Sequence, residues 1–320
     1  MRLLRTAPAP LFLLSRLVHQ HGIKVVLTGE GADEMLAGYD LFREAKVRRF
    51  WARSPKSSWR PKLLERLYPY LTRSPVAQQA LTRQFFGRGL ERAGQPGFSH
   101  EPRWSGTAAL KRLFSPDVKA ALTGRDAVKQ LLGSLPSAFS SWPKLGQDQY
   151  LEVRTLLEGY LLSSQGDRML MGNSVEGRFP FLDANVMKLA NSLPSSFKLK
   201  VLDEKHVLKR VAKGLVTDEI LNRPKQPYRA PDALSFIAAN RPAWVDEMMS
   251  PAALQKAGLF DAKVVGQLWQ KCLTRSDDGQ FSNTDNMAVV GILSAQLLQH
   301  QLVQGAPSTH QPKLTTLVER

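Results

Sequence analysis

Apolar and polar positions over the first fifty residues predict a helix, a strand and a second helix. Leu11–His21 has helical spacing, with Pro10 ahead of its first turn and Gly22 just past its end. The apolar, β-branched run Ile23–Leu27 predicts a short buried strand. Helical spacing resumes over Glu34–Phe50. Units of this kind build parallel α/β sheets, in which ligands gather at the carboxyl ends of strands.

The remaining pattern is mostly helical. Gln147–Ser163 is strongly amphipathic, and a second helix is expected over Ser163–Ser174. Glu204–Leu215 also has helical spacing, and Gln280–Gln301 predicts a long apolar helix near the end of the chain. No further strand is predicted. The fold class is therefore α/β, with helices around a small parallel sheet.

Composition and charge narrow the function classes. With 320 residues and 43% hydrophobic content, the chain can build a sizeable core. Its 44 Lys and Arg against 28 Asp and Glu give a net charge of +16, which favours phosphates, acidic metabolites, nucleic acid or anionic membranes as ligands. The single cysteine, Cys272, excludes an intramolecular disulfide framework, and no Cys/His spacing is typical of zinc. A cytoplasmic location is expected.

Two stretches suggest other partners. The N-terminus resembles a signal peptide, but Arg16 interrupts its apolar run, and Leu11–Val18 is too short to span a bilayer, so no membrane partner is expected. The basic segment 43–103 is interpreted as a mobile insertion or a helical surface region. Trp51, Trp59 and Trp104 could serve as stacking platforms if this chain bound nucleic acid, but no nucleic-acid-binding module is recognisable.

Three acidic residues crowd the turn after the predicted strand, in "TGEGADE". Gly29 and Gly31 allow a sharp turn and a close approach to a ligand, with Glu30, Asp33 and Glu34 beside it. Such carboxylates could bind Mg²⁺ together with nucleotide phosphates, or one could move a proton. Alternatively, the last two acids cap the next helix and favour its dipole.

Charged residues in the second half could complement this turn. In "GDRMLMGNSVEGRFPFLD", Arg178 could form a simple internal ion pair with Glu176 or with Asp183. In "DEKHVLKRVA", Lys205 and Lys209 lie four positions apart, which is usual for a solvated helix face but is also suited to binding phosphate.

Lys225 is different because it lies in a proline-bounded loop, "LNRPKQPYRAPD". Pro224 fixes the backbone there, so the lysine can be aimed at a ligand. Two cations about 4 Å from a phosphate would each contribute on the order of 4 kcal/mol at an effective dielectric constant of 20.

Taken together, "VVLTGEGADEMLAGY", "GDRMLMGNSVEGRFPFLD", "EKHVLKR" and "RPKQPYRAPD" resemble the synthetase domain of glutamine-hydrolysing asparagine synthetases, which β-lactam synthetases share. The resemblance runs over about 9–234 and more weakly to 301, with small departures at Ala37 and Phe179. It implies a pyrophosphatase-type ATP-binding fold, of the adenine nucleotide alpha-hydrolase kind. This domain would cover 1–305, followed by a polar tail at 306–320.

The resemblance also implies a reaction. ATP would activate the carboxylate of aspartate or a related acid as an acyl-adenylate, and ammonia, supplied directly or from glutamine, would displace AMP to form an amide such as asparagine. Asp33 would bind Mg²⁺ on the pyrophosphate, while Thr28 and Gly29 would contact the adenylate. Glu30 would lie beside the acyl centre, Lys205 would hold the leaving pyrophosphate, and Lys225 would stabilise the transition state.

Two features of the family are absent from this sequence. It contains no S-G-G-x-D-S phosphate loop and no glutaminase domain with a cysteine after the initiator methionine, where Arg2 stands instead. We therefore expect an N-terminally truncated synthetase that is active only when another polypeptide supplies these parts. An inactive truncated paralogue and an amide ligase of specialised metabolism, like the β-lactam synthetases, remain as alternatives. A homodimer is compatible with the sequence.

Overall fold

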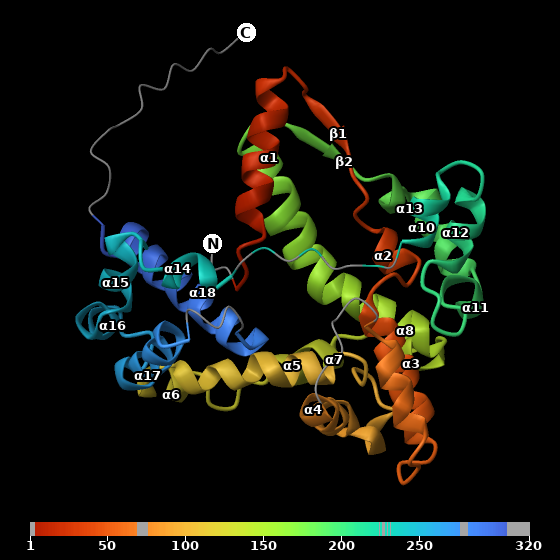
Figure 1. The fold of residues 1–320 in the computed structure, drawn as a ribbon, viewed down its shortest axis with the longest axis horizontal. Coiled ribbons are helices and arrows are strands. Elements are labelled where there is room, and N and C mark those ends of the chain that lie inside the picture. The colour runs from red at the N-terminus through yellow and green to blue at the C-terminus, as the bar shows by residue number, and fades with distance from the viewer. Residues whose placement is uncertain are drawn as a thin grey trace. The chain divides into compact units, whose positions relative to one another are not determined.

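The structure is a computed structural model that describes residues 4–68, 76–223, 225, 228, 230, 232–275 and 281–305 (Figure 1). The chain divides into two compact units. We call residues 7–108 and 125–230 the sheet unit, and residues 1–6, 109–124 and 231–320 the helical unit. The domain bounds predicted from the sequence stay a prediction, and the tail at 306–320 lies outside the described residues.

Most described elements of the sheet unit are helices, and its strands are short. In chain order they are α1 (Pro8–Gln20), β1 (Val25–Leu27), α2 (Ala32–Met35), α3 (Asp40–Ala52), η1 (Arg60–Arg66), α4 (Val76–Gly87), η2 (Leu90–Arg92), α5 (Glu101–Ala108), α7 (Ala127–Gly133), η4 (Ser137–Ser141), α8 (Lys144–Glu152), η5 (Val153–Asp167), α9 (Arg168–Met171), β2 (Glu176–Arg178), η6 (Pro180–Leu182), α10 (Ala184–Ser192), α11 (Ser195–Lys198), α12 (His206–Ala212) and α13 (Asp218–Asn222).

Within the described residues, β1 and β2 form a two-stranded parallel sheet. Val25 is opposite Glu176 and Leu27 is opposite Arg178. The backbone N–H of Thr28 donates to the carbonyl of Arg178 at 2.9 Å, so the ladder ends where the acidic turn begins. The prediction of mostly helical structure with a small parallel sheet is confirmed. The strand β2 was not predicted, because three residues reading Glu-Gly-Arg carry no strand pattern.

Helix α1 packs against η5 and α9, which form the long helix beside it in Figure 1. The contact is fixed by Ser15, a buried polar residue in an apolar helix. Its Oγ donates to the carbonyl of Met169 at 2.7 Å, and the side-chain amide of Asn173 donates to Ser15 Oγ at 2.8 Å. The predicted helix at 11–21 is thus confirmed, beginning three residues earlier than the pattern indicated.

Two predicted helices differ from the structure in detail. The continuous helix expected over 34–50 is wrong: α2 ends at Met35 and α3 begins at Asp40, with a tight turn between them. The helix predicted over 147–163 forms but changes its winding, because α8 continues from Val153 as the π-helix η5. Hydroxyls bond back onto the main chain there, as Thr155 Oγ1 does to the carbonyl of Leu151 at 2.7 Å.

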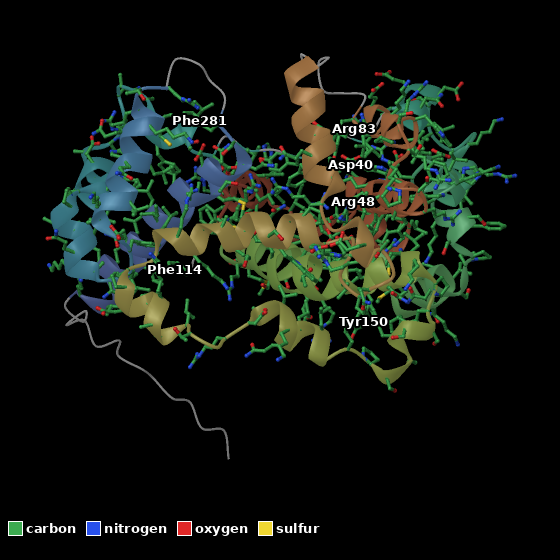
Figure 2. The ribbon with its side chains drawn as sticks, turned by 90° about the horizontal axis from the view of Figure 1, so that it is seen from below. Asp40, Arg48, Arg83, Phe114, Tyr150 and Phe281 are labelled. Atoms are coloured by element: carbon green, nitrogen blue, oxygen red, sulfur yellow. The ribbon has the colours of Figure 1, made fainter. Side chains whose placement is uncertain are left out.

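The basic segment 43–103 contains a hydrophobic cluster of buried residues, namely Val47, Trp51, Leu64, Leu67, Phe86, Leu90 and Phe98. Arg48 of α3 joins this cluster with a side chain that is 1% exposed (Figure 2). Its guanidinium donates to the carbonyls of Phe86, Arg88 and Phe98 at 3.0, 2.9 and 2.7 Å and lies 4.0 Å from the Phe98 ring centroid. Burial lowers the pKa of Arg48 to about 10. The arginine therefore links the main chain at these three residues to α3.

This packing bears on the nucleic-acid alternative. Trp51 is buried in the cluster, and its indole N–H donates to the carbonyl of Pro55 at 3.1 Å. Trp59 is exposed, and the Trp104 ring lies against His100. Trp51 therefore cannot offer a face on which a base could stack.

The helical unit is organised around one hydrophobic core. Its described elements are η3 (Ala109–Leu113), α6 (Pro116–Ala121), α14 (Leu234–Ile237), α15 (Ala243–Met249), α16 (Pro251–Ala257), α17 (Ala262–Leu273), α18 (Asn283–Leu298) and η8 (Gln299–Val303). The core includes Cys272, which is fully buried and whose thiol has its pKa raised by burial to about 11. The predicted closing helix is confirmed as α18 with its continuation η8.

Apolar side chains remain exposed around α1 and β1. Leu13, Leu14 and Leu17 are about half exposed at 53%, 54% and 50%, and Leu27 of β1 is 75% exposed. Buried strands of α/β sheets normally have both faces covered. The strand predicted as buried is thus largely uncovered in this chain. Among the helices described here, none is long and apolar enough to cross a membrane.

Candidate functional site

The acidic turn begins at the end of β1 and folds back through the one-turn helix α2. Gly31 precedes α2 with φ of 89°, a left-handed conformation that favours glycine. A Cβ on Gly31 would lie 2.3 Å from Leu182 Cδ2, so a side chain has no room there. The turn therefore requires Gly31 for two reasons, conformation and packing.

A second tight turn links α2 to α3 and sets the position of Asp33. Ala37 has φ of 57°, which is strained for a residue with a side chain. A Cβ on the next residue, Gly38, would lie 1.9 Å from Asp33 Oδ1. The carboxylate of Asp33 thus occupies the space that any larger residue at position 38 would fill.

Asp33 forms ion pairs with two lysines that are far away in the sequence. Lys205 Nζ donates to its Oδ1 at 3.0 Å, and Lys225 Nζ donates to its Oδ2 at 2.7 Å. The three side chains are 18%, 23% and 21% exposed, so the cluster is sheltered but open to solvent. We call these three residues the Asp33 cluster. Three of the residues predicted from the sequence to share a site are therefore in direct contact.

Charge keeps the Asp33 carboxylate ionised. Burial on its own would raise the pKa of Asp33, but the nearby charges of Lys205 and Lys225 outweigh it, so the pKa is lowered below its ordinary value. Lys205 has φ of 50° and stands just before α12, so its backbone is in a conformation that costs about 1 kcal/mol for a non-glycine residue.

The sequence suggested that Lys205 and Lys209 share a helix face, and this is wrong. Lys205 precedes α12, whereas Lys209 lies within it and contacts Asp203 and Glu204 at 2.7 and 3.2 Å. Pro224, which was expected to aim Lys225, lies outside the described residues. The helix predicted at 204–215 is confirmed over a shorter range, 206–212.

Tyr39 connects Glu34 to Lys225, and no sequence pattern singled it out. Its hydroxyl donates to Glu34 Oε1 at 2.8 Å, and Lys225 Nζ lies 5.4 Å from the centroid of its ring. Glu34 is 1% exposed, and burial raises the pKa of its carboxyl. Burial, followed by the charge of Glu34, raises the pKa of Tyr39 as well. Glu34 is thus a buried acceptor for Tyr39 rather than a group facing a ligand.

Gln149 of α8 satisfies the carboxyl end of α2. Its side-chain amide donates to the carbonyls of Glu34 and Met35, and its Oε1 accepts from Lys198 Nζ at 2.7 Å. Lys198 is 4% exposed, and burial lowers its pKa to about 8. These two residues brace the helix that carries Asp33. The sequence could have indicated such residues only if some polar positions of an amphipathic helix had been recognised as buried.

The remaining predicted residues line the start of the turn. Thr28 Oγ1 is buried without a hydrogen-bond partner in the described part of the chain, and an added Cβ on Gly29 would meet nothing within 4 Å. Glu30 is half-buried, and among the described residues it forms no hydrogen bond or ion pair with the Asp33 cluster. The space beside Gly29 is open, so a ligand could approach the main chain here.

Charges in the "VEGRFPFLD" segment have structural partners. Glu176 and Arg178 form the ion pair that the sequence suggested, at 2.8 Å, but on an exposed strand instead of inside the protein. Asp183 caps α10 by accepting from the backbone N–H groups of Asn185 and Val186 at 2.8 and 3.3 Å.

The fit to a metal ion can be tested on the carboxylates. In the described residues, no cluster of three or more His, Cys, Asp or Glu could hold a metal by itself. Mg²⁺ usually takes one or two carboxylates, with substrate phosphates and water completing its shell. Asp33, ionised and reachable from solvent, fits such a shared site but not an all-protein cage.

The comparison with known families decides what this arrangement belongs to. The family model described as asparagine synthase matches residues 3–300. The chain belongs to the asparagine synthase family. The resemblance inferred from the motifs is thereby confirmed, because the match spans both units.

Curated relatives of this asparagine synthase family member carry two kinds of name. "Amidase chry2" of Gibberella zeae is 27% identical over 324 residues, covering 88% of this chain and 42% of that protein. "Amidase chyE" of Penicillium rubens is also 27% identical, covering 86% of this chain and 42% of that protein. "Asparagine synthetase [glutamine-hydrolyzing] 1" of Bacillus subtilis is 29% identical over 230 residues, covering 70% of this chain and 32% of that protein. The chain thus spans less than half the length of these relatives.

Proposed function

We propose that this chain supplies the lysine and carboxylate side of an ATP-dependent amide-forming site. A carboxylate substrate, aspartate or a related acid, would be converted to an acyl-adenylate and then to an amide. The observation that carries the proposal is the Asp33 cluster, in which lysines 172 and 192 positions away meet one carboxylate at the end of β1. Ligand sites of parallel α/β folds occur at such strand ends.

The reaction proceeds in two balanced steps. A carboxylate oxygen of the substrate attacks the α-phosphorus of ATP, and the bond to the leaving pyrophosphate breaks. Ammonia, free or released from glutamine, then attacks the acyl carbon and loses a proton, and AMP departs with the carboxylate oxygen that had attacked phosphorus, while the other oxygen remains as the amide carbonyl. The products are the amide, AMP and pyrophosphate, asparagine being the product when aspartate is the acid.

The Asp33 cluster suits the first step. Before substrate binds, the ionised Asp33 holds both ammonium groups in place, so little reorganisation is required when phosphates arrive. Lys225 would then donate to the α-phosphate, and Lys205 would donate to the departing pyrophosphate. Each contact at about 4 Å contributes on the order of 4 kcal/mol at an effective dielectric constant of 20.

Released in part from its lysines, Asp33 would bind Mg²⁺ on the pyrophosphate. The ion, when bound, neutralises phosphate charge that develops during transfer.

The start of the turn suits the nucleotide and the acyl group. The open space beside Gly29 permits the adenylate to approach the main chain, and Thr28 would contact it from the same side. Glu30, one residue further, would accept the proton that ammonia loses when the amide forms.

A second polypeptide segment is part of the proposal. A phosphate loop that cradles pyrophosphate by its main chain would complete the site, together with a glutaminase where glutamine is the ammonia source. The exposed side chains of α1 and β1 support such a partner, because the apolar surface they present would be covered by added sheet and helix. The pyrophosphatase-type fold and the cytoplasmic location belong to this proposal as well.

The names of the fungal relatives favour a second candidate within the same chemistry. Both are called amidases and both align over more of this chain than the Bacillus subtilis protein does. An amide-forming step on a different carboxylate, as in specialised metabolism, is the alternative substrate class. An inactive paralogue would retain the fold and lose the reaction.

Reconstitution tests the proposed function. The purified chain is assayed with ATP, Mg²⁺, aspartate and ammonia for release of AMP and pyrophosphate, alone and with a purified fragment that contains the phosphate loop of a relative. We expect no turnover alone and turnover with the fragment, and Lys225→Ala should abolish it. Lys188→Ala, which removes an exposed lysine on α10, is the control. Full activity of the chain alone, or of Lys225→Ala in the mixture, would contradict the proposal.

A further inference from the structure

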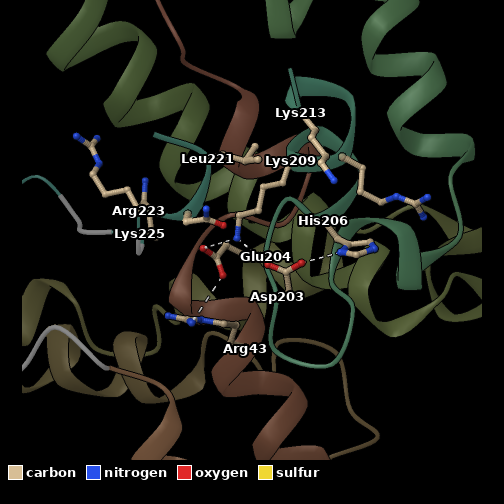
Figure 3. Close-up of a pocket in the computed structure, with 11 residues that line it drawn as sticks. Arg43, Asp203, Glu204, His206, Lys209, Lys213, Leu221, Arg223 and Lys225 are labelled. Carbon is tan, nitrogen blue, oxygen red and sulfur yellow. Dashed lines mark hydrogen bonds and ion pairs between the residues drawn. The ribbon is translucent and has the colours of Figure 1, made fainter. Parts of the chain in front are cut away.

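A cavity of about 420 Å³ lies next to the Asp33 cluster and shares only Lys225 with it (Figure 3). It is bounded by the loop before α12, by α12 itself, by the residues that follow α13, and by Arg43 of α3. This volume is in the range of small-molecule sites. The cavity is therefore large enough for a ligand of its own.

The lining carries far more positive than negative charge. Its cations are Arg43, Lys209, Arg210, Lys213, Arg223 and Lys225, and its acids are Asp203 and Glu204. His206 also lines it and is hydrogen-bonded through Nδ1 to Asp203 Oδ2 at 2.6 Å. Six cations against two acids leave an excess of four positive charges on one small surface. A cavity with low-dielectric walls focuses such a field on an anion.

Five of the six cations divide into a fixed floor and a free rim, while the sixth, Lys225, is paired with Asp33. Arg43 forms the floor with a side chain 8% exposed, and it donates to the carbonyl of Leu67 at 2.8 Å and lies 3.7 Å from Glu204. Its Nε is buried without a hydrogen-bond partner in the part of the chain that the structure describes. Lys209 is engaged by both acids of the lining. These residues have charges that the fold already balances in part.

The rim is made of Arg210, Lys213 and Arg223. No ion pair or side-chain hydrogen bond involves any of the three among the described residues. Their charges are thus available to a ligand. Figure 3 shows Lys213 and Arg223 on opposite sides of Glu204 and Lys209, so an anion between them would be contacted from two directions.

We propose that this cavity is a second anion site that binds a compound with two or more linked phosphate groups. One phosphate group carries roughly 1.5 to 2 negative charges at pH 7, so two linked groups carry about three, which matches the three unpaired cations of the rim. A single phosphate would leave part of the rim unmatched. The inference goes beyond the proposed function, since it needs neither Asp33 nor Lys205.

Binding by the full chain tests this proposal. Inorganic pyrophosphate, ADP, AMP and inorganic phosphate are each titrated into the protein by calorimetry at low and moderate salt. We expect saturable binding of pyrophosphate and ADP, with AMP and inorganic phosphate at least tenfold weaker, and a decrease in affinity with salt. If ADP binds more tightly than pyrophosphate, the ligand is a nucleotide that carries linked phosphates. If pyrophosphate binds more tightly than ADP, the ligand is the free anion. Equal binding of all four compounds would overturn the proposal.

Variants separate the cavity from the Asp33 cluster. The triple variant Arg210→Ala, Lys213→Ala, Arg223→Ala should weaken pyrophosphate binding by about tenfold or more. Lys129→Ala, which removes an exposed charge on α7, should not change the affinity. Lys205→Ala should retain it too, whereas the proposed function predicts that this variant loses amide formation in the reconstituted mixture. Loss of binding in Lys205→Ala with retention in the triple variant would assign the anion to the Asp33 cluster and overturn the second site.

Folding of the variants is checked independently. Saturating pyrophosphate should raise the midpoint of thermal unfolding of the wild-type protein and of Lys129→Ala, because a ligand that binds the native state stabilises it. The triple variant should unfold at the same temperature as the wild type without ligand and show no shift with it. A shift of wild-type size in the triple variant would contradict the proposal.

Discussion

Arg48 and Asp33 are both charged groups withdrawn from water, and the fold satisfies them in different ways. Arg48 donates to three main-chain carbonyls within its own segment. Asp33 contacts two charged side chains that arrive from another part of the sheet unit. Main-chain acceptors stay in place for as long as the fold lasts, whereas a lysine side chain can leave its carboxylate for a phosphate. Arg48 therefore stabilises the fold, whereas the Asp33 cluster has the side-chain partners that the proposed function requires to be exchangeable.

Replacing Arg48 should have the largest effect. Arg48→Ala removes the donor from two buried carbonyls and one partly buried carbonyl and opens a cavity beside Phe98, so the free energy of unfolding should fall by about 3 kcal/mol or more. Urea unfolding followed by tryptophan fluorescence measures this, since Trp51 belongs to the same cluster. Arg88→Ala keeps its carbonyl and removes only an exposed side chain, so it should change stability by less than about 0.5 kcal/mol. Equal losses of unfolding free energy in Arg48→Ala and Arg88→Ala would show that the buried guanidinium stabilises the fold no more than an exposed side chain does.

Breaking the Asp33–Lys225 pair should have a smaller effect on stability. A double-mutant cycle with Asp33→Asn and Lys225→Met is expected to give a coupling energy of about 1 kcal/mol at pH 7, because the pair is partly solvated. The folded pKa of Asp33 is lowered, so this stabilisation is present above the unfolded value of 3.8 and is lost as the pH falls through the folded pKa. A coupling that grows on acidification would show that the pair is not ionic.

Lys198 offers the finest test, because it is a buried cation with a side-chain acceptor where Arg48 has main-chain ones. Its folded pKa of about 8 lies below its ordinary value of 10.5, so the folded state binds fewer protons between these two pH values. Stability should therefore rise with pH in that window, by about 1 kcal/mol from pH 8 to 9. The free energy of unfolding of Lys198→Met, compared with the wild type at each pH, should lack this rise. A parallel pH dependence in both proteins would place the proton elsewhere.

The sequence predicted the helices, strand and turn that form the site better than it predicted the residues that hold them in place. Helical spacing located α1, α12 and α18, and the glycine turn after β1 was found because glycines and acids stand together there. Asp33, Lys205 and Lys225 were expected to converge, and they do. The expectation came from motif resemblance, since ion pairs across 172 and 192 positions leave no periodic signal in the chain.

The features that were missed have local physical causes. The break between α2 and α3 depends on the left-handed backbone at Ala37 and on the room that Gly38 leaves for Asp33. Neither is evident from hydrophobic spacing, which continues through both residues. Gln149 was missed because polar residues in an amphipathic helix usually face solvent, and Lys198 was missed because lysines are rarely buried. The roles predicted for Thr28, Gly29, Glu30, Asp33, Lys205 and Lys225 stay predictions.

The accessibility of Cys272 to reagents reports where the structure begins to open. It is the single cysteine of the sequence and is fully buried in the helical unit, so a thiol-alkylating reagent can reach it only when that core opens. The rate of alkylation as denaturant increases would follow the helical unit alone, while tryptophan fluorescence follows the sheet unit once Trp244 and Trp269 of the helical unit are replaced by Phe. These two measurements, made on one sample, would show whether the two units unfold in one cooperative transition or one after the other.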